Sequence, residues 1–123
     1  DYETLVQVAK ETPAIAIKSG VTIGVEYMGF NLKRMPMKDQ AFRRALSLAT
    51  DRAMLAAEAW KEQAVPTNSI VSTVLDFWHN ANVEKGMYDL DKAKQVLTAA
   101  GYSWVGGRLY YPDGVKDTVM APK

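Results

Sequence analysis

Few residue types in this chain could carry out covalent chemistry. His79 is its single histidine, and Asp76 and Asn80 are the polar residues near it in the sequence. A catalytic histidine needs partners within hydrogen-bonding reach, and a zinc site needs further His or Cys ligands. The chain has no cysteine, and none of its serines lies in a nucleophile-elbow motif. We therefore predict no catalytic residue and no metal ligand, and we interpret His79 as a surface or capping residue.

The glycines give no sign of a phosphate-binding loop. Neither Gly101 nor the pair Gly106 and Gly107 begins a G-x-x-x-x-G-K sequence, in which backbone N–H groups cradle phosphates. Phosphate chemistry is therefore disfavoured, and the sequence predicts no cofactor.

Arginines in two consecutive predicted helices could form a nucleic-acid-binding motif of the helix-turn-helix kind. Arg43 and Arg44 precede a corner at Thr50 and Asp51 that is shorter than the turn of a helix-turn-helix motif. The second helix is rich in alanine, whereas the recognition helix of such a motif carries side chains that contact bases. The net charge is only +1, from 15 basic and 14 acidic residues, so no phosphate-binding footprint is indicated. We predict no nucleic-acid partner, and we expect Arg43 to pair with Asp39 across one helical turn.

The length and composition indicate a single globular domain. The chain has 123 residues, of which 48% are hydrophobic, enough to bury a core. It contains no apolar run of the roughly 18 residues that a membrane helix needs. It starts at Asp1 and shows no signal peptide, which suggests a processed protein or an excised piece, and the lack of cysteine permits either redox compartment.

Apolar and polar residues alternate with period two before residue 32. Val21, Ile23, Val25 and Tyr27 are apolar at one parity, and after Gly29 the parity changes. This pattern predicts a strand over 21–32 whose buried face changes at Gly29. Before it, the sequence predicts a short helix that ends before Pro13. Such a strand is a candidate connector between two bodies.

The pattern becomes helical from Asp39. Apolar residues recur at helical spacing over 39–61, and Thr50 with Asp51 indicates a second helix start within that range. Residues 62–88 lack any such period although they contain Phe77 and Trp78, so we expect this loop to pack against a partner surface.

A further helix is predicted over 89–100. Asp89 is placed to cap its start, and Gly101 to end it. Short strands around two glycines then predict a hairpin over about 103–114. The predicted fold is α+β, a single domain over 1–123 in which a short sheet from the 14–32 region is packed by helices.

Two ordered blocks followed by the hairpin carry a resemblance to a known family. The first block is GFNLKRMPMKDQAFRRALSLATDRAML and the second is YDLDKAKQVLTAAGYSW, and the hairpin ends in YPDG. Together they resemble the bacterial extracellular solute-binding proteins of family 5, the peptide/nickel-type receptors of ABC importers. The resemblance covers roughly residues 25–114. The matching positions are Phe30, Asn31, Pro36, Asp39, Arg43, Ala45, Asp51, Tyr88, Asp89, Ala93, Leu97, Ala100 and Gly101.

The resemblance implies a fragment of a larger two-lobed receptor of the periplasmic-binding-protein type II fold. The chain would be the start of the C-terminal lobe, and residues 21–32 would include a hinge strand. Glu26, Tyr27 and Met28 fall on the segment that borders the cleft in relatives, so they are the predicted ligand contacts. A structural role is expected for Phe30, Asn31, Asp39, Arg43, Asp51, Asp89 and Gly101.

The implied function is solute capture without catalysis. The receptor would enclose an oligopeptide or similar small solute between its lobes and deliver it to an ABC permease. It would lie in the periplasm or outside the cell, associated with the membrane through the transporter. Which solute it carries stays open, because the family includes receptors for peptides, nickel complexes, haem and sugars. The alternative is a standalone protein-interaction module that buries Phe77 and Trp78 against another protein.

Overall fold

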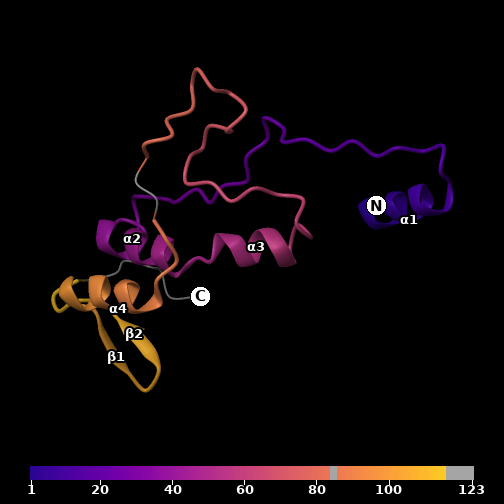
Figure 1. Cartoon of the computed structure of the whole chain (residues 1–123). Coiled ribbons are helices and arrows are strands. Elements are labelled where there is room, and N and C mark those ends of the chain that lie inside the picture. Colours follow the sequence, from indigo (N-terminus) through magenta and orange to yellow (C-terminus); the bar gives the residue numbers. More distant parts are fainter. Residues whose placement is uncertain (84–85, 116–123) are drawn as a thin grey trace, which may run out of the picture.

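The computed structural model describes residues 1–83 and 86–115, which form helices and a small antiparallel sheet (Figure 1). This confirms the predicted α+β class. The elements, in chain order, are α1 (Tyr2–Glu11), α2 (Gln40–Ala49), α3 (Arg52–Glu58), α4 (Leu90–Ala99), β1 (Ser103–Val105) and β2 (Arg108–Tyr110).

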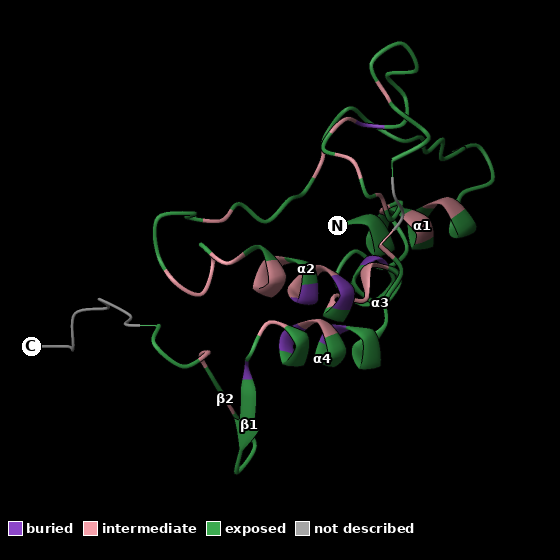
Figure 2. Cartoon of the chain, turned by 90° about the vertical axis from the view of Figure 1, so that its left-hand side faces the viewer, coloured by how far each residue is buried: buried purple, intermediate pink, exposed green. Residues whose placement is uncertain are grey.

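The core lies between α2 and α4. Ala45 and Leu48 are three residues apart on α2, and Ala93 and Leu97 are four apart on α4, so each pair lies on one helical face. Figure 2 shows buried segments, in purple, on both α2 and α4, and the buried residues of the two helices belong to one cluster. Alanine at two of the four positions lets the helix backbones approach closely. The start of α4 is also joined to the end of α2, because the backbone N–H of Asp89 donates to the Leu48 carbonyl over 2.9 Å.

A hairpin follows α4, as the sequence predicts. Ser103 pairs with Tyr110, and Val105 pairs with Arg108, in antiparallel register. Gly106 and Gly107 have φ angles of 57° and 78°, the positive values that a two-residue type I′ turn requires at both central positions. Tyr102 anchors the hairpin to the helices, since this residue immediately before β1 is buried in the core.

Helix α1 lies apart from this core (Figure 1). Asp1 caps it by accepting a hydrogen bond from the Thr4 N–H, and the helix ends before Pro13, which confirms the predicted short helix. None of its residues is buried. Among residues 1–83 and 86–115, no helix is both long enough and apolar enough to cross a membrane.

Residues 14–32 do not form the predicted sheet. In the part of the chain that the structure describes, the sheet consists of β1 and β2, and the segment 21–32 runs without a β-ladder. A strand needs a neighbouring backbone to receive its N–H and C=O groups, and no described segment supplies one here. Ile23 and Tyr27, which the alternation would bury, are 70% and 76% exposed. The sheet predicted for the 14–32 region was therefore wrong for the described residues, whereas the hinge strand predicted at about 21–32 has no partner strand among them and stays a prediction.

The predicted helical range 39–61 is two helices with a sharp corner, as the second start signal indicates. Thr50 leaves helical geometry, and its hydroxyl donates to the Leu46 carbonyl over 2.8 Å. Asp51 then caps α3 by accepting from the Met54 N–H over 2.9 Å. Helix α3 ends at Glu58, three residues before the predicted limit.

The loop after α3 is held by its own hydrogen bonds and by one bond to a distant segment. Ser72 is 5% exposed, and its hydroxyl donates to the Thr22 carbonyl over 2.8 Å. His79 bonds through Nδ1 to the Val71 carbonyl over 3.0 Å. The loop therefore lies beside the 21–32 segment, although 50 positions separate Ser72 from Thr22 in the sequence.

Candidate functional site

The predicted ligand contacts lie on the extended segment and face solvent. Tyr27 is 76% exposed, Met28 is 68% exposed, and Glu26 is also exposed. Their side chains make no hydrogen bond or ion pair with another described residue. The three side chains are thus accessible to a binding partner, and the structure brings no second functional group against them.

A series of hydrogen-bonded turns connects this segment to α2. Asn31 accepts the Lys33 N–H through its side-chain Oδ1 over 3.0 Å, which fixes the first turn. The Lys38 N–H then donates to the Arg34 carbonyl over 2.7 Å, and the Asp39 N–H to the Pro36 carbonyl over 3.0 Å. We call residues 31–39 the connector. Its backbone is held by successive turns from the extended segment to the first residue of the helix.

Arg43 reaches back from α2 to the connector. Its Nη1 donates to the carbonyl oxygens of Met37 and Lys38 over 2.7 and 2.9 Å. The predicted side-chain pair of Arg43 with Asp39 was therefore wrong. The two residues do stand one helical turn apart, but the guanidinium instead satisfies two carbonyls at the helix start, where the chain turns back toward α2.

Asp39 binds two groups through its two carboxylate oxygens. Oδ1 accepts the Ala41 N–H over 2.9 Å and caps α2. Oδ2 accepts the hydroxyl of Tyr102 over 2.8 Å, across 63 positions of sequence. Burial and the hydrogen bond to Asp39 raise the pKa of Tyr102 well above its ordinary value, so the hydroxyl stays protonated as a donor. One carboxylate thus starts a helix and holds the hairpin against it.

The other predicted structural residues lie at the ends of α3 and α4. Asp51 caps α3, and Asp89 caps α4 by accepting the Lys92 N–H over 2.8 Å. Gly101 follows α4 with φ of 87°, and the N–H groups of Gly101 and Tyr102 donate to carbonyls in the last turn. This is a Schellman motif, in which a residue in left-handed geometry satisfies the final carbonyls of a helix. These three residues therefore begin or end helices.

A cavity of about 560 Å³ lies beside α2 and the start of α4. Its lining includes the basic side chains of Arg44, Arg52 and Lys92, together with Asp89, whose carboxylate caps α4. The Arg52 guanidinium is held by Ser47, donating to its carbonyl over 3.2 Å and to its hydroxyl over 2.8 Å. This basic cavity is not among the predicted sites.

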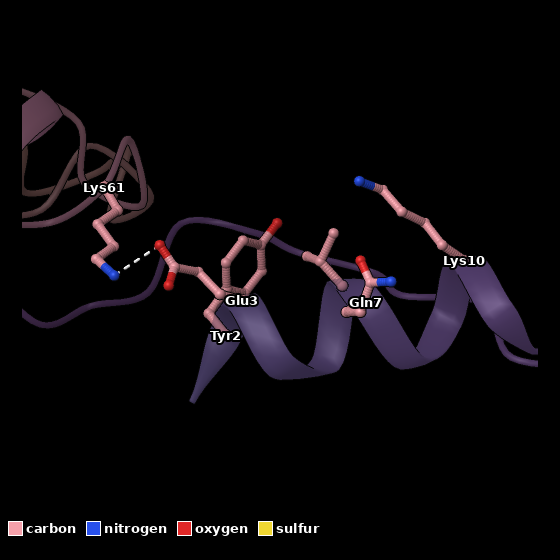
Figure 3. A pocket seen from close by; sticks show the side chains of 6 residues that line it. Tyr2, Glu3, Gln7, Lys10 and Lys61 are labelled. Carbon is pink, nitrogen blue, oxygen red and sulfur yellow. Dashed lines mark hydrogen bonds and ion pairs between the residues drawn. The ribbon is translucent and has the colours of Figure 1, made fainter.

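A second cavity, of about 330 Å³, lies against α1 (Figure 3). An ion pair between Lys61 and Glu3 closes one side of it over 2.6 Å. Both side chains are more than 60% exposed, so solvent screening leaves this pair worth about 0–1 kcal/mol. The cavity places no candidate catalytic group next to another.

The described residues provide no metal centre. No group of three or more His, Cys, Asp or Glu side chains in residues 1–83 and 86–115 could hold an ion. His79 serves the loop as a capping side chain through its bond to Val71, in agreement with the interpretation from the sequence.

Comparison with protein families gives a match that covers almost all of the chain. The model of the bacterial extracellular solute-binding proteins, family 5 (middle), matches residues 2–122. The chain belongs to this family. The resemblance carried by the two sequence blocks and the hairpin is thereby confirmed.

Curated proteins match the chain at low identity. Heme-binding protein A of Haemophilus influenzae is 27% identical over 94 residues, which is 76% of this chain and 17% of that protein. The dipeptide-binding protein of Escherichia coli is 24% identical over 92 residues, 75% of this chain and 17% of that protein. The chain thus spans about a sixth of the length of these relatives. No solved structure gives a significant match.

Contacts between residues far apart in the chain could not be predicted from the sequence. The Asp39–Tyr102 and Ser72–Thr22 bonds each join residues at least 50 positions apart, and no local pattern marks such a pair. The basic cavity is not predicted either, because its lining joins Arg44 and Arg52 of consecutive helices to Lys92, which is distant in the sequence.

Proposed function

We propose that this chain is part of the substrate-binding component of an ABC importer. The component captures an oligopeptide or similar small solute in a cleft between two lobes and delivers it to a membrane permease. The observation that carries the proposal is the family 5 match over residues 2–122. The relatives are named for dipeptide and haem binding, which supports a small solute as ligand.

In this proposal the 123 residues belong to one lobe, and residues 21–32 act as a hinge. Their extended backbone has no strand partner among the described residues, as expected for a segment that pairs with chain outside this sequence. Ligand binding shifts the equilibrium between the open and closed states, because the ligand binds the two states with different affinities. The receptor works outside the cytoplasm, is associated with the membrane through its permease, and performs no covalent chemistry.

The proposed ligand contacts are Glu26, Tyr27 and Met28. Their exposure supports this role, because an aromatic ring, a thioether and a carboxylate together suit backbone and apolar contacts with an extended peptide. Replacing Tyr27 with alanine should raise the Kd of the ligand about tenfold, equivalent to about 1.4 kcal/mol. Tyr110→Ala is a matched control, since Tyr110 is 48% exposed on the hairpin, which carries none of the proposed contacts.

Binding to the full-length protein tests the substrate class. Dipeptides, tripeptides and haem would be titrated separately by calorimetry, and tryptophan fluorescence would follow closure. Saturable binding of peptides supports the proposal, and Tyr27→Ala should weaken it while Tyr110→Ala does not. Binding of haem alone would replace the peptide assignment, and binding of no small solute would contradict a receptor.

A standalone interaction module is the second candidate, favoured by one observation. Phe77 and Trp78 are 87% and 71% exposed at the loop, and their rings meet edge to face with centroids 4.9 Å apart. Paired exposed aromatic rings are typical of protein interfaces. Binding of no small solute, together with a protein–protein contact that replacement of both residues by serine abolishes, would favour this second function.

A further inference from the structure

The connector is attached to the helical core at two points. Arg43 holds the carbonyls of Met37 and Lys38, the last two residues before the cap of α2. Asp39 holds the Tyr102 hydroxyl at the start of the hairpin. Because α2 and Tyr102 belong to the same core, the end of the connector is fixed to one rigid body.

The Arg43 contact is built for rigidity. Hydrogen bonds from a charged donor are shorter and stronger than neutral ones, and here one terminal nitrogen serves two consecutive peptide carbonyls. The side chain starts within the first turn of α2, so the helix and the connector can change direction only if these bonds break. Arg43 is half-buried, which limits competition from water.

The chain before the connector has little structure to hold it. Residues 21–30 form no helix or β-ladder, and the side chains of Tyr27 and Met28 touch solvent. The hydroxyl of Ser72 holds the Thr22 carbonyl at the far end of this stretch. Residues 25–30 make no hydrogen bond with another described residue, although Val25 and Phe30 are half-buried, so the connector is the nearest hydrogen-bonded anchor that follows Tyr27.

We propose that Arg43 is a positioning residue, which fixes the direction of residues 26–30 relative to the helical core and so orients Tyr27 for ligand contact. The first half of this inference, that Arg43 fixes the direction of residues 26–30, does not depend on the proposed function. The second half, that Tyr27 is thereby oriented for ligand contact, rests on the proposed function. Arg43 touches no ligand in this account. It acts through the two carbonyls of the connector.

Distance measurements between paired spin labels test the first half. The chain has no native cysteine, so labels at Met28→Cys and Lys94→Cys would report the segment and the exposed face of α4. They would be placed in the full-length receptor after removal of any cysteine elsewhere in it. Arg43→Met should broaden the distance distribution. Arg43→Lys should broaden it less, because an ammonium group still donates hydrogen bonds. The control Arg108→Met, on the hairpin, should leave the distribution unchanged.

Ligand affinity, measured in the same variants without labels, tests the second half. If Arg43→Met lowers the fraction of receptor with Tyr27 correctly placed to about a tenth, the Kd for a dipeptide such as Ala-Phe rises about tenfold. Arg43→Lys should recover part of the affinity, and urea midpoints would show that all variants are folded under the binding conditions. A distance distribution as narrow in Arg43→Met as in the wild type would overturn the inference. A broadened distribution with unchanged dipeptide affinity would overturn the link to ligand contact, whereas wild-type receptor that binds no dipeptide would count against the proposed function alone.

Discussion

The bond between Tyr102 and Asp39 can be removed by a single small change. Tyr102→Phe deletes the hydroxyl and keeps the ring, which is 3% exposed and lies 5.9 Å from the ring of Phe42 and 6.1 Å from that of Tyr111. Packing is therefore preserved, and the change in the free energy of unfolding reports the hydrogen bond. The cap of α2 is also preserved, because Asp39 uses its other oxygen for the Ala41 N–H.

The expected loss follows from the surroundings of the bond. Hydrogen bonds to charged groups contribute about 1.5–3 kcal/mol, and the O–O distance of 2.8 Å is near the optimum. Asp39 is only half-buried, so water can replace part of the interaction in the variant. We expect Tyr102→Phe to lower the free energy of unfolding by about 1–2 kcal/mol.

Urea unfolding followed by circular dichroism would measure this loss. A double-mutant cycle with Asp39→Asn isolates the pair, since asparagine is also a good helix cap. A coupling energy of about 1 kcal/mol or more is expected. A coupling energy near zero, or a Tyr102→Phe variant as stable as the wild type, would refute the conclusion that this bond holds the hairpin to α2.

The same bond gives a pH dependence. The folded pKa of Tyr102 is raised above the ordinary tyrosine value of 10.0 by burial and by the bond to Asp39. A raised folded pKa contributes stability that is complete below the unfolded pKa and is lost as the pH rises toward the folded value. The stability advantage of the wild type over Tyr102→Phe should therefore be constant below pH 10 and shrink above it, as urea midpoints at each pH would show.

Three further substitutions test local features, each by urea unfolding. Gly101→Ala should cost about 1–2 kcal/mol, because an L side chain is unfavourable at φ of 87°, and a neutral effect would argue against the Schellman motif. Asp89→Ala should cost about 1 kcal/mol through loss of the α4 cap, whereas Asp91→Ala, in the same first turn, should cost only a few tenths; equal losses would contradict the capping role. Ser72→Ala should cost about 1–2 kcal/mol and speed hydrogen exchange in the 69–80 loop, because the Thr22 carbonyl loses its partner; unchanged exchange would show that the loop is held by other contacts.

Local features of the fold were predictable because neighbouring residues determine them. Helix starts follow from the cap residues Asp39, Asp51 and Asp89, whose side chains each reach an N–H group two or three positions ahead. The hairpin follows from two consecutive glycines that tolerate positive φ. Such features need no knowledge of the rest of the molecule.

The failures of prediction all involve partners that the local sequence does not specify. The alternation at 21–32 describes what a strand would bury, but a strand forms only beside another backbone, and none is present among the described residues. The spacing of Arg43 and Asp39 favours a helical pair, yet the connector folds back and offers carbonyls to Arg43 while Tyr102 takes the carboxylate. The predicted contacts Glu26, Tyr27 and Met28 remain predictions, because their proposed partner is a ligand.

The hydrogen bond between the Asp89 N–H and the Leu48 carbonyl closes the chain segment 49–88 at its base. Both ends of this segment leave the core at one point, so its length has little influence on how α2 and α4 pack. The entropic cost of closing a loop rises only slowly as residues are added to it. Residues added to or removed from this segment should therefore leave the packing of α2 against α4 unchanged, so a reporter domain can be grafted into it while the scaffold keeps its geometry.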